Sequence, residues 1–71
     1  MYKYFRVNTT QSLGFGKNEI IMKKTEYVSA KTEEAVTKDY VGRLGLYLMS
    51  LAITEIEETA VPKSSRIYIV G

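Results

Sequence analysis

The sequence predicts a small α+β domain, in which one long helix packs on one face of an antiparallel sheet, in the order ββαβ or ββαββ. Three observations lead to this prediction. Residues 2–7 and 66–70 alternate aromatic or β-branched side chains with other residues, which is typical of strands. Apolar residues recur at every fourth position from Val36, which is typical of a helix. The 71 residues suffice for a single domain, residues 1–71, with one thin core.

The first two strands are predicted at residues 2–7 and 19–28, joined by a loop at residues 8–18 that is rich in Thr, Ser, Gly and Asn. We expect antiparallel pairing, because no crossover element lies between them. Lys24 and Glu26 interrupt the inward face of the second strand, so a bulge or the end of pairing is expected there. The side chains expected to face the helix are Phe5, Val7, Ile20, Met22, Ile67 and Ile69.

The helix is expected to begin after Thr32, a good N-cap residue, with Glu33 and Glu34 in its first turn. Its apolar stripe consists of Val36, Tyr40, Leu44, Leu48, Ala52 and Ile56. One possibility is a helix that continues to residue 56, with about seven turns. The other is a helix that ends near Ser50, with residues 53–61 as an extra strand. A turn at residues 62–65 then leads into a last strand at residues 66–70.

Composition excludes several stabilising devices and functions. The chain has no Cys and no His, which excludes disulfides and a structural zinc site, so self-association is the remaining common device for so small a core. The net charge of +2 neither requires nor excludes nucleic acid. The longest apolar stretch, residues 44–53, is about half of a membrane span, and residues 1–7 do not resemble a signal peptide. We expect a cytoplasmic protein that does not enter membranes.

The sequence argues against an enzyme. Besides lacking His and Cys, it has one Asp, at position 39, and its paired glutamates lie where a helix surface is predicted. Residues 14–17, Gly-Phe-Gly-Lys, lack the spacing and the following Ser or Thr of a phosphate-binding loop. No catalytic residue, cofactor or metal site is therefore expected.

Two glycines, Gly42 and Gly45, flank Arg43 in a segment that resembles the Gly-x-x-Gly loop of KH domains, which joins two helices and holds a nucleic-acid backbone. The alternative is that both glycines lie within one helix, where a second backbone packs closely at some cost in helix propensity.

One predicted sheet face is rich in tyrosine and basic residues. For nucleic acid, tyrosines would stack on bases while Arg6, Lys23 and Arg66 hold phosphates. For a protein partner, tyrosine and arginine are the residues enriched at interface hot spots. The residues of this face are Tyr2, Tyr4, Arg6, Ile21, Lys23, Tyr27, Arg66 and Tyr68.

Two further groups favour protein partners. Leu13 and Phe15, with Lys17 beside them, lie in a Gly-flanked loop, where they either fold back onto the core or project as anchors. The predicted helix is also apolar on sides that one sheet cannot cover, which indicates a homo-oligomer interface. The uncovered residues are Leu46, Tyr47, Met49 and Ile53.

Residues 15–23, Phe-Gly-Lys-Asn-Glu-Ile-Ile-Met-Lys, are followed by a Thr/Ala/Glu-rich helix and a short last strand. This arrangement resembles the Dmd antitoxin family of T-even phages, whose members block a host RNase toxin. The resemblance implies a phage-encoded inhibitor of a host factor that acts by binding. The loop at residues 8–14 and the turn at Pro62 depart from the family. The resemblance implies contacts through Phe15, Lys17, Glu19, Ile20 and Met22.

The sequence therefore predicts a non-enzymatic protein that occupies the surface of a protein partner. The alternative is a small RNA- or DNA-binding protein, which would use either the tyrosine-rich face or the segment with Gly42, Arg43 and Gly45.

Overall fold

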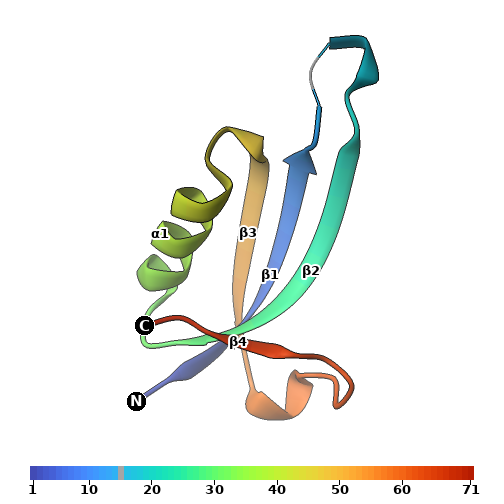
Figure 1. The fold of residues 1–71 in the computed structure, drawn as a ribbon. Helices are drawn as coiled ribbons and strands as arrows, with labels where there is room; N and C mark the ends of the chain where they lie inside the picture. The colour runs from blue at the N-terminus through green and yellow to red at the C-terminus, as the bar shows by residue number, and fades with distance from the viewer. Residues whose placement is uncertain (15) are drawn as a thin grey trace.

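The computed structural model describes residues 1–14 and 16–71, which form one four-stranded sheet with one α-helix (Figure 1). The elements follow the order ββαββ, which confirms the α+β fold and the longer of the two predicted orders. The strands lie side by side as β3-β1-β2-β4. The bounds are β1 (Lys3–Ser12), β2 (Ile21–Ala30), α1 (Glu33–Leu44), β3 (Leu48–Ile56) and β4 (Ile67–Ile69), with short 3₁₀ turns η1 (Gly16–Asn18), η2 (Gly45–Tyr47) and η3 (Glu58–Ala60).

The sequence predicted an antiparallel sheet, but the sheet is mixed. β1 pairs antiparallel with β2 and β3, whereas β4 pairs parallel with β2. Residues 57–66 carry the chain from β3 at one edge to β4 at the other, so β4 runs in the same direction as β3 and β2. A parallel pair requires such a crossover, because a tight turn always reverses the chain.

The β1–β2 hairpin is longer than predicted. Pairing continues without a shift from Lys3 opposite Ala30 to Ser12 opposite Ile21, so the expected bulge at Lys24 and Glu26 is wrong. Glu26 remains in the strand because its Oε1 accepts a hydrogen bond of 3.0 Å from the Tyr40 hydroxyl. The irregularity lies instead between β1 and β3, at Thr10 and Gln11.

The predicted helix end is wrong in both versions. α1 ends at Leu44, because Gly45 adopts a φ of 51°, a left-handed conformation that favours glycine. After the short turn η2 the chain enters β3, so the extra strand of the second version is present, but it begins at Leu48 and not at residue 53. Leu48, Ala52 and Ile56 continued the apolar spacing by coincidence, since a step of four residues also fits the two-residue period of a strand.

The core lies between α1 and the part of the sheet where β4 pairs, which we call the base end. Thr32 caps α1 as predicted, accepting a hydrogen bond of 3.1 Å from the Ala35 amide. Leu44, Leu51, Ile53 and Val70 pack around the buried residues. The fully enclosed apolar residues are Phe5, Val7, Val28, Ala30, Val36 and Tyr40.

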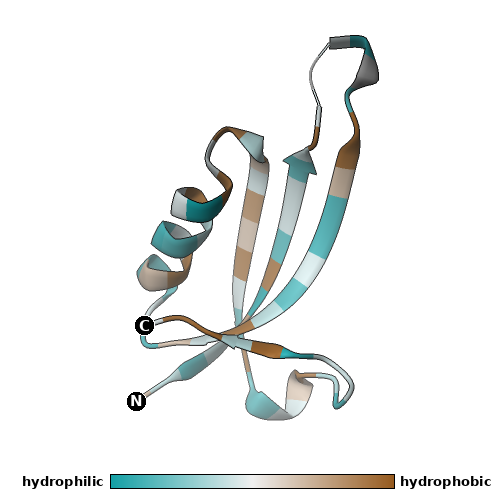
Figure 2. Ribbon diagram, in the orientation of Figure 1, coloured by the Kyte–Doolittle hydropathy of each residue, from teal (hydrophilic) through white to brown (hydrophobic). Residues whose placement is uncertain are grey.

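The opposite end of the sheet, which we call the hairpin end, comprises residues 11–14 and 16–23 together with residues 45–49. It extends well beyond α1 in the ribbon, and apolar positions continue into it (Figures 1 and 2). The molecule is correspondingly elongated, with principal dimensions of 44 × 24 × 15 Å. Within the described residues, no helix is long and apolar enough to cross a membrane.

Candidate binding surfaces

Large apolar side chains are exposed at the hairpin end. Leu13 is 48% exposed and Ile20 is 61% exposed, and Ile21 beside them is also exposed. The Leu13 amide donates to the Ile20 carbonyl at 2.8 Å, which continues the hairpin and orders the backbone that carries both side chains. Leu13 therefore projects from the hairpin and is not part of the core. Phe15 lies outside the described residues.

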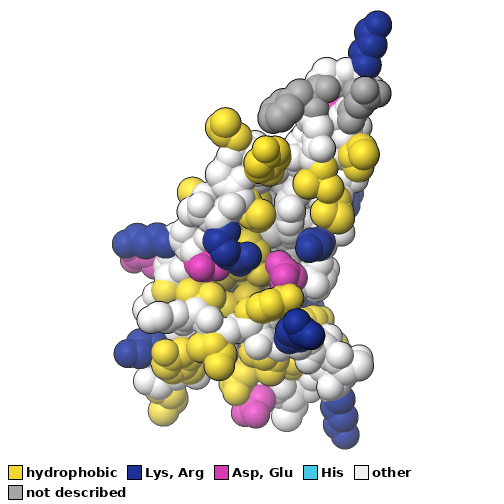
Figure 3. Space-filling model, in the orientation of Figure 1, with side chains coloured by type: hydrophobic (Ala, Val, Ile, Leu, Met, Phe, Trp, Pro, Cys, Tyr) yellow, Lys and Arg dark blue, Asp and Glu magenta, His cyan; other side chains and the backbone are white. Residues whose placement is uncertain are grey.

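The connection between α1 and β3 adds apolar groups to the same end. Leu46 is 94% exposed and Met49 is 54% exposed, and Leu48 pairs with Gln11, two residues before Leu13. In the space-filling view, apolar side chains gather around this end on the side of the sheet that carries α1 (Figure 3). Leu46, Tyr47 and Met49 thus belong to η2 and β3, not to a helix as predicted.

The predicted oligomer interface is also wrong at Ile53. Ile53 is half-buried and packs against the core, so it is not an uncovered side chain. The prediction assumed helical geometry, whereas the alternation of β3 turns Ile53 toward the face that α1 covers, beside Val7.

The other face of the sheet, which we call the open face, is not covered by α1, the one α-helix of the described residues (Figure 1). Tyr4 and Tyr27 lie on it, on the two central strands, and both are half-buried. Arg6 is directly opposite Tyr27 in the β1–β2 register and is exposed. The strand residues that the register places on the open face include Arg6 and Lys23 and no carboxylate. This part of the predicted tyrosine-rich face is present.

The sequence predicted that Tyr68 of β4 lies on the same face as Tyr4 and Tyr27, and this prediction is wrong. The parallel register of β4 places Tyr68 beside Val28, and therefore on the face that α1 covers. Ile67 and Ile69 lie beside Tyr27 and Ser29 on the open face, although both were expected to face the helix. Arg66 is exposed just before β4. The direction of β4, which the sequence does not encode locally, decides these orientations.

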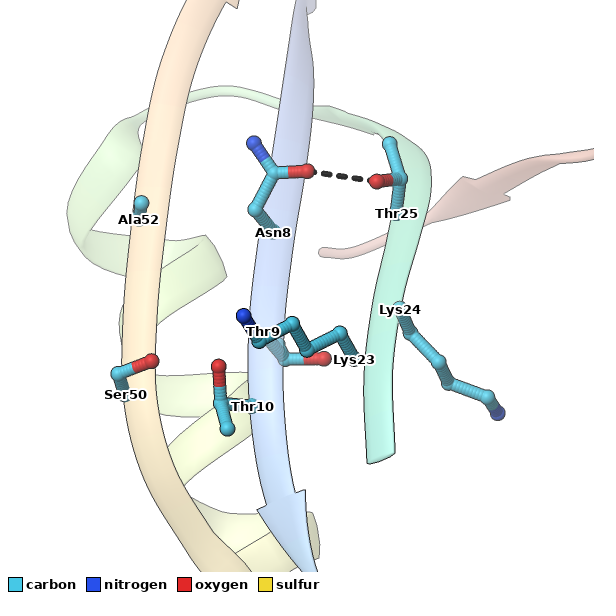
Figure 4. A pocket seen from close by; sticks show the side chains of 8 residues that line it. All are labelled: Asn8, Thr9, Thr10, Lys23, Lys24, Thr25, Ser50 and Ala52. Carbon is cyan, nitrogen blue, oxygen red and sulfur yellow. Dashed lines mark hydrogen bonds between the residues drawn. The ribbon is translucent and has the colours of Figure 1, made fainter. Parts of the chain in front are cut away.

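A shallow depression of about 330 Å³ lies on the open face, across β3, β1 and β2 (Figure 4). Small polar side chains and Ala52 surround it, and Lys23 extends over it. The Thr25 hydroxyl donates to Asn8 Oδ1 at 2.7 Å, which links the two central strands. Sequence reasoning missed Asn8, Thr10 and Thr25, although strand alternation extended beyond Val7 would have aligned them. The lining residues are Asn8, Thr9, Thr10, Lys23, Lys24, Thr25, Ser50 and Ala52.

The segment with Gly42, Arg43 and Gly45 does not form the two-helix arrangement of a KH loop, because the three-residue turn η2 and then the strand β3 follow α1. Nothing lies within 4 Å of the position that a side chain at Gly42 would take, so close approach of a second backbone is also not seen among the described residues. Arg43 donates through Nε to Asp39 Oδ2 at 2.8 Å and lies 4.7 Å from the Tyr40 ring centre. This cluster lies on α1, on the opposite side of the sheet from Arg6.

Tyr40 is the most perturbed ionisable group. Burial raises the pKa of its hydroxyl well above the ordinary value, and the hydrogen bond to Glu26 raises that pKa further. The neutral hydroxyl therefore holds α1 to β2. Among the described residues, no three acidic, His or Cys side chains group in a way that would hold a metal ion.

No known protein family, curated protein or solved structure matches this chain. Its surfaces define two candidates for binding: the apolar hairpin end and the basic, tyrosine-containing open face.

Proposed function

We propose that this chain is a non-enzymatic binding protein that engages a protein partner through its hairpin end. The observation that supports the proposal is the exposure of Leu13, Ile20 and Leu46 at one end of the molecule, outside the core. Exposed apolar groups gathered in this way mark protein interaction sites, because covering them releases ordered water. Lys17, exposed on η1, supplies a positive charge at the rim of this surface.

Substitution at this end tests the proposal. Leu13→Asp places a charge within the apolar surface, and we expect it to abolish copurification of the partner from cells in which the protein is naturally made. Val41→Asp is the matched control, because Val41 is similarly exposed, at 51%, but lies on α1. Nuclease treatment should leave the complex intact. Equal loss of the partner in both variants would contradict the proposal.

A second candidate function, nucleic-acid binding, is favoured by the open face. Tyr4 and Tyr27 occupy the two central strands, where sheet proteins stack bases. Arg6 and Lys23 supply positive charge, and none of the strand residues that the register places on that face is a carboxylate. Tyr27→Ala should then weaken single-stranded RNA binding by about 1–3 kcal/mol, and binding should fall steeply with salt. Tight, salt-sensitive RNA binding that survives Leu13→Asp would favour this function over the first.

The resemblance to phage antitoxins supports a more specific version, in which the partner is a host toxin and binding inhibits it in the host cytoplasm. Glu19 and Ile20 lie at the hairpin end, and Met22 opposes Gln11 there. Coexpression with the toxin tests this version. Rescue of growth by the wild type and not by Leu13→Asp is expected, and rescue by neither protein would overturn the inhibitor version alone.

We also propose that the chain self-associates, because a core of six fully enclosed apolar residues leaves much apolar surface exposed. Sedimentation at micromolar concentration tests this, with a dimer as the expected species.

A further inference from the structure

β3 forms one edge of the sheet and is more exposed than its neighbour β1. It has nine residues, and none of them is buried, whereas β1 beside it has four buried residues. α1 packs on the sheet against both β2 and β3, so it lies over the face and not beside the outer edge of β3. Among the described residues, no backbone hydrogen bond pairs that outer edge with another segment.

The hydrogen-bond pattern identifies which backbone groups of β3 are unpaired. Leu13 bonds to Ile20 across the hairpin, so the odd-numbered residues of β1 direct their backbone groups toward β2. Hydrogen-bonded pairs alternate along antiparallel strands, so the even-numbered residues of β1 bond to β3. Ser50, Ala52 and Thr54 are their partners. The backbone N–H and C=O groups of Leu51, Ile53 and Glu55 therefore point away from β1, in the plane of the sheet.

The opposite edge of the sheet carries more protection than β3, whose one irregularity lies at its start, opposite Thr10 and Gln11. β4 is only three residues long, and the part of β2 that extends beyond it carries Lys23 and Lys24. Short strands and lysines are the usual means of preventing edge-to-edge pairing. β3 contains no Lys, Arg or Pro, and its only charged residue is Glu55. Such an edge is a template for an additional strand.

We propose that the occupant of this edge is β3 of a second copy, paired antiparallel about a two-fold axis at Ala52, so that two sheets join into one of eight strands. This inference deepens the proposed self-association and rests on it. The register pairs the regular part of β3, from Ser50 to Thr54, whereas the irregularity opposite Thr10 and Gln11 places Leu48 and Ile56 on different faces of the sheet. Leu51 lies opposite Ile53, Ser50 opposite Thr54, and Ala52 opposite itself.

Charge and composition favour a second copy in this orientation. Glu55 lies opposite the segment of Leu48 and Met49 of the other copy, which carries no charge, so no like charges are directly opposed. Antiparallel pairing also sends the acidic residues at the end of β3, Glu55, Glu57 and Glu58, to opposite ends of the interface, whereas parallel pairing would place them side by side. On the face that carries α1, Leu51 and Ile53 would add apolar contact across the axis beside the existing core.

Single cysteines test the register directly, since the natural chain contains none. Ala52 belongs to a non-hydrogen-bonded pair in the proposed dimer, whose Cα atoms would lie about 4.5 Å apart, within disulfide range. Under mild oxidation, Ala52→Cys should give nearly complete covalent dimer. Thr54→Cys is the matched control on the same face and strand, and it should crosslink poorly because Thr54 faces Ser50. More efficient crosslinking of Thr54→Cys would overturn the register.

Charge substitution tests the same axis without oxidation. Ala52→Lys places two cations directly opposite each other and should weaken dimerisation by about tenfold or more, and Ala52→Glu should do the same with two anions. An equal mixture of the two variants should restore the dimer, which also shows that both are folded. A wild-type monomer in sedimentation would overturn self-association and this inference together. A wild-type dimer that neither Ala52 variant weakens would overturn the inference alone, and the hairpin-end partner experiment is independent of both results.

Discussion

The base end and the hairpin end share the strands β1 and β2, yet only the base end has an apolar core. β1 buries Phe5 and Val7 under α1, whereas Leu13, which follows β1, is half exposed. Length explains the difference. A helix of 12 residues spans about 18 Å, whereas a strand of ten residues spans about 33 Å. α1 therefore cannot cover the whole hairpin, and apolar residues beyond it remain available to a partner.

The largest expected effect is at the base end. Phe5 is 1% exposed, and Phe5→Ala should lower the free energy of unfolding by about 3–5 kcal/mol, from lost burial and the cavity that remains. Urea denaturation followed by circular dichroism measures it. A loss below about 1 kcal/mol would mean that Phe5 contributes little to the stability of the base end, which would contradict the difference between the two ends.

Tyr40→Phe should cost about 2 kcal/mol, because it leaves the Glu26 carboxylate without its donor. It should also change the pH dependence of stability. The pKa of Tyr40 is higher in the folded chain than in the unfolded chain, so its contribution is complete below about pH 10 and is lost as the pH rises further. Denaturation curves across alkaline pH should thus fall less steeply for Tyr40→Phe than for the wild type.

Glu26→Gln is the matched control for that prediction. It keeps an acceptor oxygen for the Tyr40 hydroxyl but removes the negative charge that helps to raise the Tyr40 pKa. We expect an intermediate alkaline slope. If both variants follow the wild-type slope, the Tyr40–Glu26 contact does not couple α1 to β2 as described.

Removal of the helix cap should have a smaller effect. Thr32→Ala deletes the oxygen that accepts from the Ala35 amide and should cost about 1 kcal/mol, measured by thermal melting. Thr32→Ser retains that oxygen and should stay close to the wild type. If Thr32→Ser loses as much as Thr32→Ala, the methyl group and not the cap is responsible.

The smallest effect on stability is expected at the hairpin end, where the effect on binding is largest. Leu13→Ala should change the free energy of unfolding by less than about 0.5 kcal/mol, as is usual for exposed sites. Partner affinity should fall by about 2 kcal/mol or more if Leu13 is an anchor. Thermal melts and titration calorimetry measure the two quantities. A stability loss of roughly 2–5 kcal/mol would make Leu13 a core residue and remove the contrast between the two ends.

Local patterns were sufficient for several elements. The antiparallel hairpin, the Thr32 cap and the burial of Phe5, Val7, Val36 and Tyr40 were all predictable, because each depends on residues close in sequence or on the alternation within one element. The candidate site was predictable only in part. The sequence left open whether Leu13 packs onto the core or projects from the loop, and the structure places it outside the core.

The sequence by itself determined the α+β class, the register-defining alternation of β1 and the start of α1. Only the tertiary structure decided where α1 ends, which way β4 runs and which apolar residues stay exposed. Glu26 illustrates the reason. A carboxylate on the inward face of a strand predicts that the strand pairing is interrupted, but Tyr40, 14 positions later, donates a hydrogen bond to it and the pairing continues. Contacts of that kind depend on how elements pack together, and no local periodicity encodes them.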